Sequence, residues 1–259
     1  MPAMLFAGVV ALSSCEKNEQ DVMNPTFEQG TIAQVLVDST EVTSYNYNGS
    51  SVSQVNHFNE ATGELESFEK FVFDASGKLI KSYTHAGSNH TVLSEQNYNY
   101  NNSGRLANST VSYFRGGKTE YSTYTSYDYS SDNKLEKKSS YEGSSAEGKL
   151  KSYTTYEVLP NGNYSQEKQF VIDDEGTAKL FSTTTYSYDT NTNPFFAIAE
   201  PGTASSPNNL VASSSLVHGS KKTYEYSYTY QYDERGYPTS QTVVSPSGKR
   251  EVFKYLYSN

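Results

Sequence analysis

The sequence is poor in cross-linking residues and in long apolar segments. Cys15 is its single cysteine, which excludes an intrachain disulfide and a cysteine-based zinc cluster. Tryptophan is absent. The apolar run Met1–Leu12 is shorter than the roughly 20 residues that a helix needs to cross a bilayer. The 259 residues are enough for one large all-β domain or two small domains.

Basic residues are also scarce. The 20 lysines and arginines are outnumbered by 29 aspartates and glutamates, so the formal net charge is −9. Nucleic-acid phosphates and anionic lipid headgroups repel an acidic surface. The composition therefore argues against nucleic acid and against an anionic membrane surface as partners.

The N-terminal residues have the pattern of a bacterial lipoprotein leader. Met1–Leu12 has the length of a signal-peptide apolar core, and Leu12–Cys15 resembles a lipobox. The resemblance implies that residues 1–15 direct export and that Cys15 is lipidated, which anchors the protein to the cell-surface or periplasmic face of the outer membrane. The alternative is a buried N-terminal strand, because no lysine or arginine precedes the apolar run. Residues 16–30 predict a flexible tether, and their acidic beginning resembles the surface-export signal of Bacteroidetes-type lipoproteins.

Tyrosine is abundant, with 24 residues, and much of it is spaced with a period of two. A period of two is typical of a β-strand, in which alternate side chains lie on opposite faces of a sheet. The clearest example predicts a strand with one aromatic and one polar face, and its aromatic face carries Tyr224, Tyr226, Tyr228, Tyr230 and Tyr232.

Shorter copies of this pattern recur about every 27–30 residues, which indicates a repeated supersecondary unit. In the typical copy two aromatic residues precede a turn that has Asp or Asn first and Gly fourth, and a leucine commonly follows. The fourth residue closes a bulged hairpin in the left-handed conformation, so Gly77, Gly104 and Gly236 are predicted to have positive φ, with Asn133 in the same role. A second turn signal halfway through each repeat makes every unit two antiparallel strands. The predicted fold is an all-β, up-and-down meander of about sixteen strands in one domain, residues 31–259.

One segment interrupts the repeat. Residues 191–210 contain three prolines, which exclude a central strand, together with the apolar residues Phe195, Phe196 and Ile198. The segment is predicted to be a loop insertion, with at most one helical turn, folded over an end or mouth of the sheet.

The repeats resemble two known groups of proteins. Phe73–Leu79 and Tyr232–Gly236 are similar to the tyrosine–aspartate repeats of Rhs-type proteins, which wind β-sheet into hollow shells. A closer resemblance, over most of the chain after about residue 40, is to uncharacterised Bacteroidetes lipoproteins with a porin-like fold. It rests on the order of Tyr186–Asp189, Asn193–Phe195, Ser206–Asn209 and Tyr230–Pro238. This resemblance implies a barrel-like antiparallel sheet and carries no functional residues.

A membrane-spanning barrel needs an apolar outward face on every strand. Lys134–Tyr141 carries charged residues on both faces, and each intramembrane charge would cost on the order of 2–4 kcal/mol at the midplane. The sequence therefore favours a water-soluble, porin-like sheet, and an outer-membrane pore is the alternative.

No catalytic motif, cofactor fingerprint or complete metal-ligand set is present. His85 and His90 flank one turn, but no third ligand is evident, and Asp173–Gly176 has the composition of a solvated turn. Paired carboxylates brought together by the meander would make a glycan-directed hydrolase the second alternative. The tyrosine row from Tyr224 to Tyr232 is either a semi-buried face or an exposed platform for a glycan or peptide. The predicted function is a lipid-anchored binding or scaffold protein that does not act as an enzyme.

Overall fold

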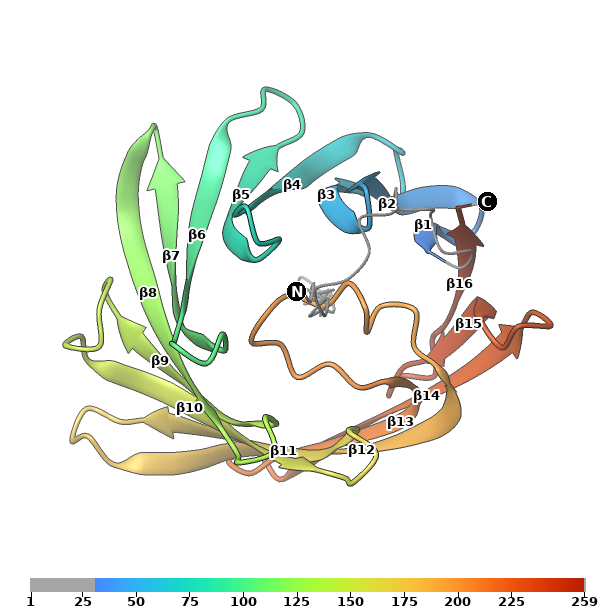
Figure 1. The fold of residues 1–259 in the computed structure, drawn as a ribbon. Helices are drawn as coiled ribbons and strands as arrows, with labels where there is room; N and C mark the ends of the chain where they lie inside the picture. Colours follow the sequence, from blue (N-terminus) through green and yellow to red (C-terminus); the bar gives the residue numbers. More distant parts are fainter. Residues whose placement is uncertain (1–30, 259) are drawn as a thin grey trace.

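The computed structural model describes residues 31–258, which form sixteen strands joined mostly by short turns (Figure 1). The strands are β1 (Ile32–Val37), β2 (Thr40–Asn48), β3 (Ser51–Phe58), β4 (Leu65–Phe73), β5 (Leu79–Ala86), β6 (Val92–Tyr100), β7 (Leu106–Arg115), β8 (Lys118–Tyr129), β9 (Leu135–Glu142), β10 (Leu150–Val158), β11 (Tyr164–Ile172), β12 (Ala178–Thr192), β13 (Asn208–Val217), β14 (Lys222–Tyr232), β15 (Pro238–Val244) and β16 (Arg250–Tyr257).

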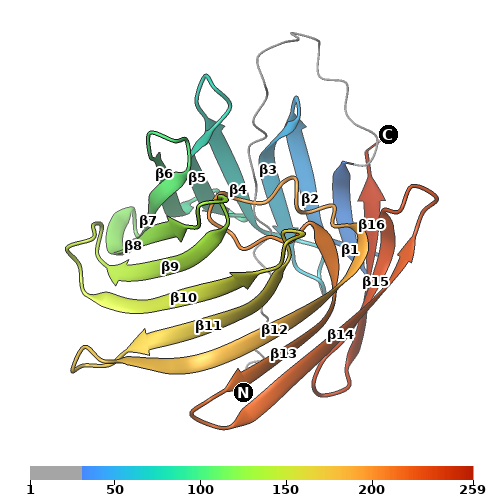
Figure 2. The same cartoon turned by 60° about the horizontal axis from the view of Figure 1, so that its bottom comes forward.

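The strands close into an antiparallel barrel. Each strand pairs with its neighbours in the chain, and β1 pairs with β16 to complete the ring. Figure 2 shows the wall from an oblique angle. Closure leaves no unpaired sheet edge, so every strand has a hydrogen-bonded partner on both sides. The predicted all-β meander of about sixteen strands is confirmed, and the structure adds that the sheet closes.

The repeated turns have the predicted geometry. Gly77, Gly104 and Gly236 have φ of 81°, 78° and 82°, and Asn133 takes the same role with φ of 65°. In the first of these turns the Gly77 amide donates to the Asp74 carbonyl over 3.0 Å. The Asp74 carboxylate accepts the amides of the residues two and four positions on. The turn chemistry read from the repeat therefore fixes one end of the barrel.

A recurring tyrosine contact accounts for the rest of the repeat. The hydroxyl of Tyr100, near the end of β6, donates to the carbonyl of Leu79 at the start of β5, over 2.7 Å. The same bond, from the last tyrosine of a strand to the first residue of the strand before it, is made by three further pairs: Tyr47 to Ile32, Tyr188 to Tyr164 and Tyr257 to Pro238. These tyrosines partly bury their rings, and each hydroxyl finds a hydrogen-bond acceptor.

Cross-strand register separates the lumen face from the outer face. Tyr45 and Tyr255 contact Phe195 from a loop inside the barrel, with ring centroids 6.4 and 5.6 Å apart, so their side of the sheet faces the lumen. The opposite side is polar. One register row on that side crosses six strands and reads Gln54, Lys70, Tyr83, Glu95, Ser112 and Ser122.

Ion pairs lie along this outer wall. Lys81 contacts Glu95 over 2.8 Å, and Lys168 contacts Glu157 over 3.1 Å. Exposed apolar side chains such as Val252 are interspersed among polar residues. Within residues 31–258 there is no helix of the length and apolarity required to cross a membrane.

The interrupting segment lies inside the barrel. Strand β12 continues to Thr192 and β13 begins at Asn208, so the connection is residues 193–207, shorter than the predicted 191–210. We call this connection the plug loop. Figure 1, which looks along the barrel, shows it in orange, projecting from the wall into the centre. The segment is a loop of successive turns, closed by bonds such as the Phe196 amide to the Asn193 carbonyl.

The outer wall predicts solubility without detergent. A chain beginning at Asn24 is expected to fold in water. Each charged side chain of the outer wall, such as Lys70 or Glu95, would cost about 2–4 kcal/mol in a bilayer. The measurement is circular dichroism with a cooperative melt in detergent-free buffer. Aggregation that only detergent relieves would contradict this reading of the wall.

Candidate binding site in the barrel lumen

Asparagine residues hold the base of the plug loop through their backbone and side-chain amides. The Asn193 amide donates to the Pro207 carbonyl over 2.9 Å, which closes the loop at its neck. Asn163, on the β10–β11 turn, is 1% exposed and donates its side-chain amide to the Asn208 side chain over 3.0 Å. Asn209 donates its backbone amide to the Asp189 carboxylate. The loop therefore leaves the wall in a fixed direction, because its neck is bonded on both sides.

The tip of the plug loop is bonded to the opposite wall. The hydroxyl of Tyr98 on β6 donates to the Glu200 carboxylate over 2.9 Å and lies 3.2 Å from the Ser82 hydroxyl. Gly202 has φ of 84°, and a Cβ at that position would collide with the ring of Tyr127 and the side chain of Leu106. Glycine is thus required there both for its conformation and for close approach to the wall.

Glu200 in the plug loop and Glu69 on β4 are two acidic groups whose pKa values are raised. Burial raises the pKa of Glu200 above its ordinary value, although the Tyr98 hydrogen bond partly opposes the shift. Burial, and then repulsion from Glu200, raises the pKa of Glu69 to about 7. Burial and the charge of Glu200 both disfavour the ionised form of Glu69, so its carboxyl group retains a proton up to about neutral pH.

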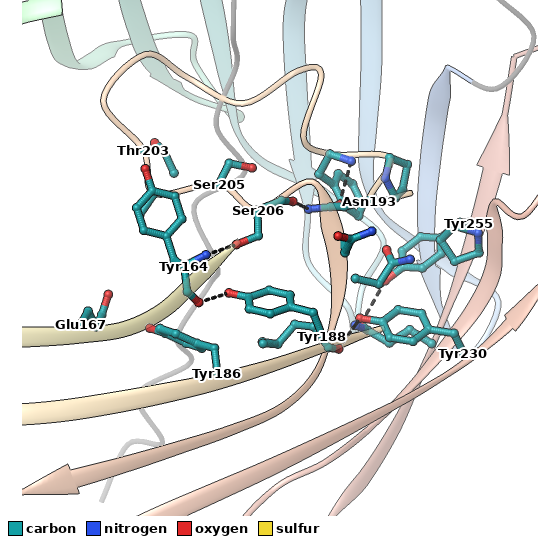
Figure 3. Close-up of a pocket in the computed structure, with 18 of the residues that line it drawn as sticks. Tyr164, Glu167, Tyr186, Tyr188, Asn193, Thr203, Ser205, Ser206, Tyr230 and Tyr255 are labelled. Atoms are coloured by element: carbon teal, nitrogen blue, oxygen red, sulfur yellow. Dashed lines mark hydrogen bonds between the residues drawn. The ribbon is translucent and has the colours of Figure 1, made fainter. Parts of the chain in front are cut away.

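A cavity of about 380 Å³ lies between the plug loop and the wall formed by β10 to β16 (Figure 3). Its volume is within the range of small-molecule sites, roughly 300–1,000 Å³. The plug side contributes Asn193, Phe195, Thr203, Ser205 and Ser206 among others. The wall side is mostly tyrosine: Tyr156, Tyr164, Tyr186, Tyr188, Tyr230 and Tyr255.

Most of the polar groups in this cavity are already positioned by hydrogen bonds. Ser206 accepts the Tyr164 amide over 3.1 Å, and the Tyr188 hydroxyl donates to the Tyr164 carbonyl over 2.7 Å. Gln241 donates to the Tyr230 hydroxyl and accepts from the Tyr255 hydroxyl. A site whose side chains are fixed before binding loses less conformational entropy when a ligand enters.

Among the described residues that line the cavity, Glu167 on β11 is the only one with a charged side chain. Burial raises the pKa of Glu167, while a hydrogen bond from the Tyr186 hydroxyl and the charge of Lys138 oppose that shift. Figure 3 shows the hydroxyl end of Tyr186 beside Glu167. Burial also lowers the pKa of Lys138.

The tyrosine row predicted as a ligand platform lies on the lumen face of β14. Its members are partly covered, and Tyr224 is the most exposed of them, at 41%. Tyr226 and Tyr228 stack with ring centroids 6.5 Å apart, Tyr230 lines the cavity, and the Tyr232 hydroxyl donates to Asp189 at the base of the plug loop. The row thus runs from an exposed end down to the cavity. The sequence did not predict Glu167 or the tyrosines of β10 to β12 as site residues, because they line a cavity only together with the plug loop.

Other predicted positions have local roles. The His85 ring is 3.0 Å from the His90 carbonyl and stacks on Phe68 at 4.7 Å. Within residues 31–258 no cluster of three or more histidine, cysteine, aspartate or glutamate side chains could hold a metal ion. Cys15, the predicted lipidation site, lies outside the described residues.

The fold and the lumen together define a closed antiparallel barrel with an internal plug. Comparison with solved structures finds a porin-like protein from Bacteroides vulgatus with a TM-score of 0.54 and 12% identity, covering 88% of this chain and 98% of that chain. A porin-like protein from Bacteroides uniformis has a TM-score of 0.47 and 15% identity, covering 90% and 100%. The complex TcdB2–TccC3 has a TM-score of 0.30 and 16% identity, covering 84% of this chain and 12% of that chain.

These comparisons establish a fold. At 12% identity, the likeness to the B. vulgatus protein shows that this chain has a porin-like barrel, as the sequence resemblance implied. The other two TM-scores are too low to support an argument. No family model and no curated protein sequence matches the chain.

The raised pKa of Glu69 predicts a pH dependence of stability. Native Glu69 retains a proton that the unfolded chain releases between its ordinary pKa of 4.5 and about 7, so the free energy of unfolding falls as pH rises through that range. Since the side chain is 31% exposed, solvent screening limits this loss to about 1–2 kcal/mol. Glu69→Gln should remove this pH-dependent loss. Between pH 4 and pH 8, the free energy of unfolding of the variant, measured by urea titration, should therefore rise relative to that of the wild type.

The matched control is Glu157→Gln on the outer wall, where Glu157 pairs with Lys168. The free energy of unfolding of this control should not rise relative to that of the wild type as pH rises. Equal pH profiles for Glu69→Gln and the wild type would show that the pKa of Glu69 is not raised in the folded protein.

Proposed function

We propose that the protein is a lipid-anchored binding protein that holds a glycan or peptide segment in the cavity between the plug loop and the tyrosine wall. The observation that carries the proposal is the cavity itself. It combines flat aromatic faces, prearranged hydroxyl and amide groups and one carboxyl group in a volume of about 380 Å³. Sugar rings and extended peptides both pack on aromatic faces and exchange hydrogen bonds with such groups.

The interior favours binding over conduction. A water-filled pore needs a continuous lumen, whereas here Phe195 packs between Tyr45 and Tyr255, and Glu200 bonds to Tyr98 on the opposite wall. The polar outer row through Lys70 and Glu95 also suits water better than lipid.

Binding is also favoured over glycan cleavage. Glycoside hydrolysis ordinarily uses two carboxyl groups that flank one bond. The cavity presents Glu167 alone among its described lining residues, while Glu200 is bonded to Tyr98 at the tip of the plug loop. We therefore propose that the protein does not act as an enzyme and that its ligand is released unchanged.

The anchor completes the proposal. Cys15 would carry the lipid, and residues 16–30 would link it to β1, whose first residue lies at the plug-base end beside the end of β16. The opposite end of the barrel, where Tyr224 is exposed, would then point away from the outer membrane and receive ligand. The tyrosine row Tyr224–Tyr232 would guide the ligand toward the cavity.

The binding site can be tested by filling it. Ala204→Trp places an indole in the cavity from the plug side and should weaken, by at least tenfold, any glycan or peptide found by array screening and measured by isothermal titration calorimetry. Tyr121→Ser, on the lumen face but outside the cavity lining, should leave affinity unchanged. Unchanged binding by Ala204→Trp, or appearance of cleaved ligand, would refute the proposal.

The anchor has a separate test. Cys15→Ala, expressed behind a functional signal peptide, should move the protein from the membrane fraction to the soluble fraction, because the lipid is its predicted attachment. The measurement is immunoblotting of fractionated cells, with a Ser14→Ala variant as the control that stays in the membrane. If Cys15→Ala remains in the membrane fraction, the lipoprotein assignment is wrong.

A further inference from the structure

Glu167 is an acidic group without a close cationic partner. It lies on the lumen face of β11 opposite Tyr156 of β10, and it is half-buried. None of the ion pairs within 4.0 Å found in residues 31–258 includes Glu167. Lys138 is near enough to act on Glu167 electrostatically but is not part of the cavity lining. A ligand in the cavity therefore meets the carboxylate and not the lysine.

Four tyrosine rings from three strands line the same cavity as this carboxylate. Tyr156 and Tyr164 meet edge to face, with centroids 5.5 Å apart and planes at 75°. Tyr186 and Tyr188 are tilted by 44° with centroids 6.5 Å apart. All four rings line the same cavity as Glu167. Rings at such angles offer π-faces from several directions, and tyrosine faces attract organic cations that lie within about 6 Å.

We propose that this cavity binds the ammonium group of an organic cation, with the four tyrosine rings as its cage and Glu167 as its counter-ion. The inference rests on the proposed function, since it names the chemistry of the ligand in that site. Two sources share this chemistry: an amino sugar within a glycan, and a lysine-type side chain within a peptide. Both join a positive charge to hydrocarbon, which suits a site with one acid and several aromatic faces.

Lys138 provides a way to test whether the bound ligand is positively or negatively charged. A protonated Lys138 competes with a bound ammonium group for Glu167, so the site holds a cation more tightly when that amine is removed. An anionic ligand would bind more weakly when the Lys138 amine is removed, because it would lose the attraction of that positive charge. Lys138→Met keeps most of the length and the apolar stem of the side chain, so it separates these two cases.

The experiment measures matched pairs of probes by isothermal titration calorimetry on the full barrel. Glucosamine is compared with glucose, and Nα-acetyl-lysine methylamide with Nα-acetyl-norleucine methylamide. In at least one pair the amine should bind tenfold or more tightly than its neutral partner, and the pair that shows the larger preference identifies the source. Glu167→Gln and Tyr186→Leu should each reduce this preference by at least fivefold, and Lys138→Met should tighten amine binding severalfold.

The control is Glu157→Gln, which removes an acid from the outer side of the neighbouring strand and should leave the preference intact. Equal binding of amine and neutral probes, or a preference that survives both Glu167→Gln and Tyr186→Leu in folded protein, would overturn the inference. If a neutral glycan or peptide still binds and Ala204→Trp still blocks it, the proposed function stands and only the ammonium assignment fails. If Ala204→Trp leaves amine binding unchanged, the cavity is not the site and both fail.

Discussion

The constraint on which this structure depends is the width of its own barrel. A closed ring of the sixteen strands seen in residues 31–258 encloses more space than wall side chains ordinarily fill, and barrels of that size commonly leave an aqueous channel. Here the plug loop occupies the interior, and Phe195 contacts rings from β2 and β16. The cavity lies between the plug loop and the wall formed by β10 to β16, so the candidate site is a consequence of how the lumen is filled.

Tyrosine is the residue that makes this arrangement compatible with a polar interior. Its ring supplies buried apolar surface, while its hydroxyl bonds to a neighbouring carbonyl, as Tyr100 does with Leu79, or to the plug loop, as Tyr98 does with Glu200. Phenylalanine in these places would leave the acceptor groups without partners, and leucine would fill less of the space. The same residue type therefore closes the repeats, supports the plug loop and forms the wall of the cavity.

Local features of the fold were predictable from the sequence, whereas the site was not. The turn glycines and Asn133 determine their own conformation, and alternation from Tyr224 to Tyr232 fixes a strand without knowledge of its neighbours. Glu167 gives no such signal, because nothing in its own segment shows that it faces a tyrosine wall and a loop from residues 193–207. Likewise, the electrostatic effect of Glu200 on Glu69 acts between a strand and a loop that are distant in the sequence. Such groups become neighbours only when the barrel closes around the plug loop, so local sequence patterns do not predict them.

The most direct test of this account is whether the plug loop lies inside the barrel in solution. Nuclear Overhauser spectroscopy on protein labelled at phenylalanine and tyrosine rings can measure it, with Phe195→Leu to assign the signals. The account predicts cross-peaks from the Phe195 ring to the rings of Tyr45 and Tyr255, whose centroids lie 6.4 and 5.6 Å away. A Phe195 ring with no inter-ring cross-peaks and the chemical shifts of a solvent-exposed phenylalanine would contradict it, since the lumen would then be open.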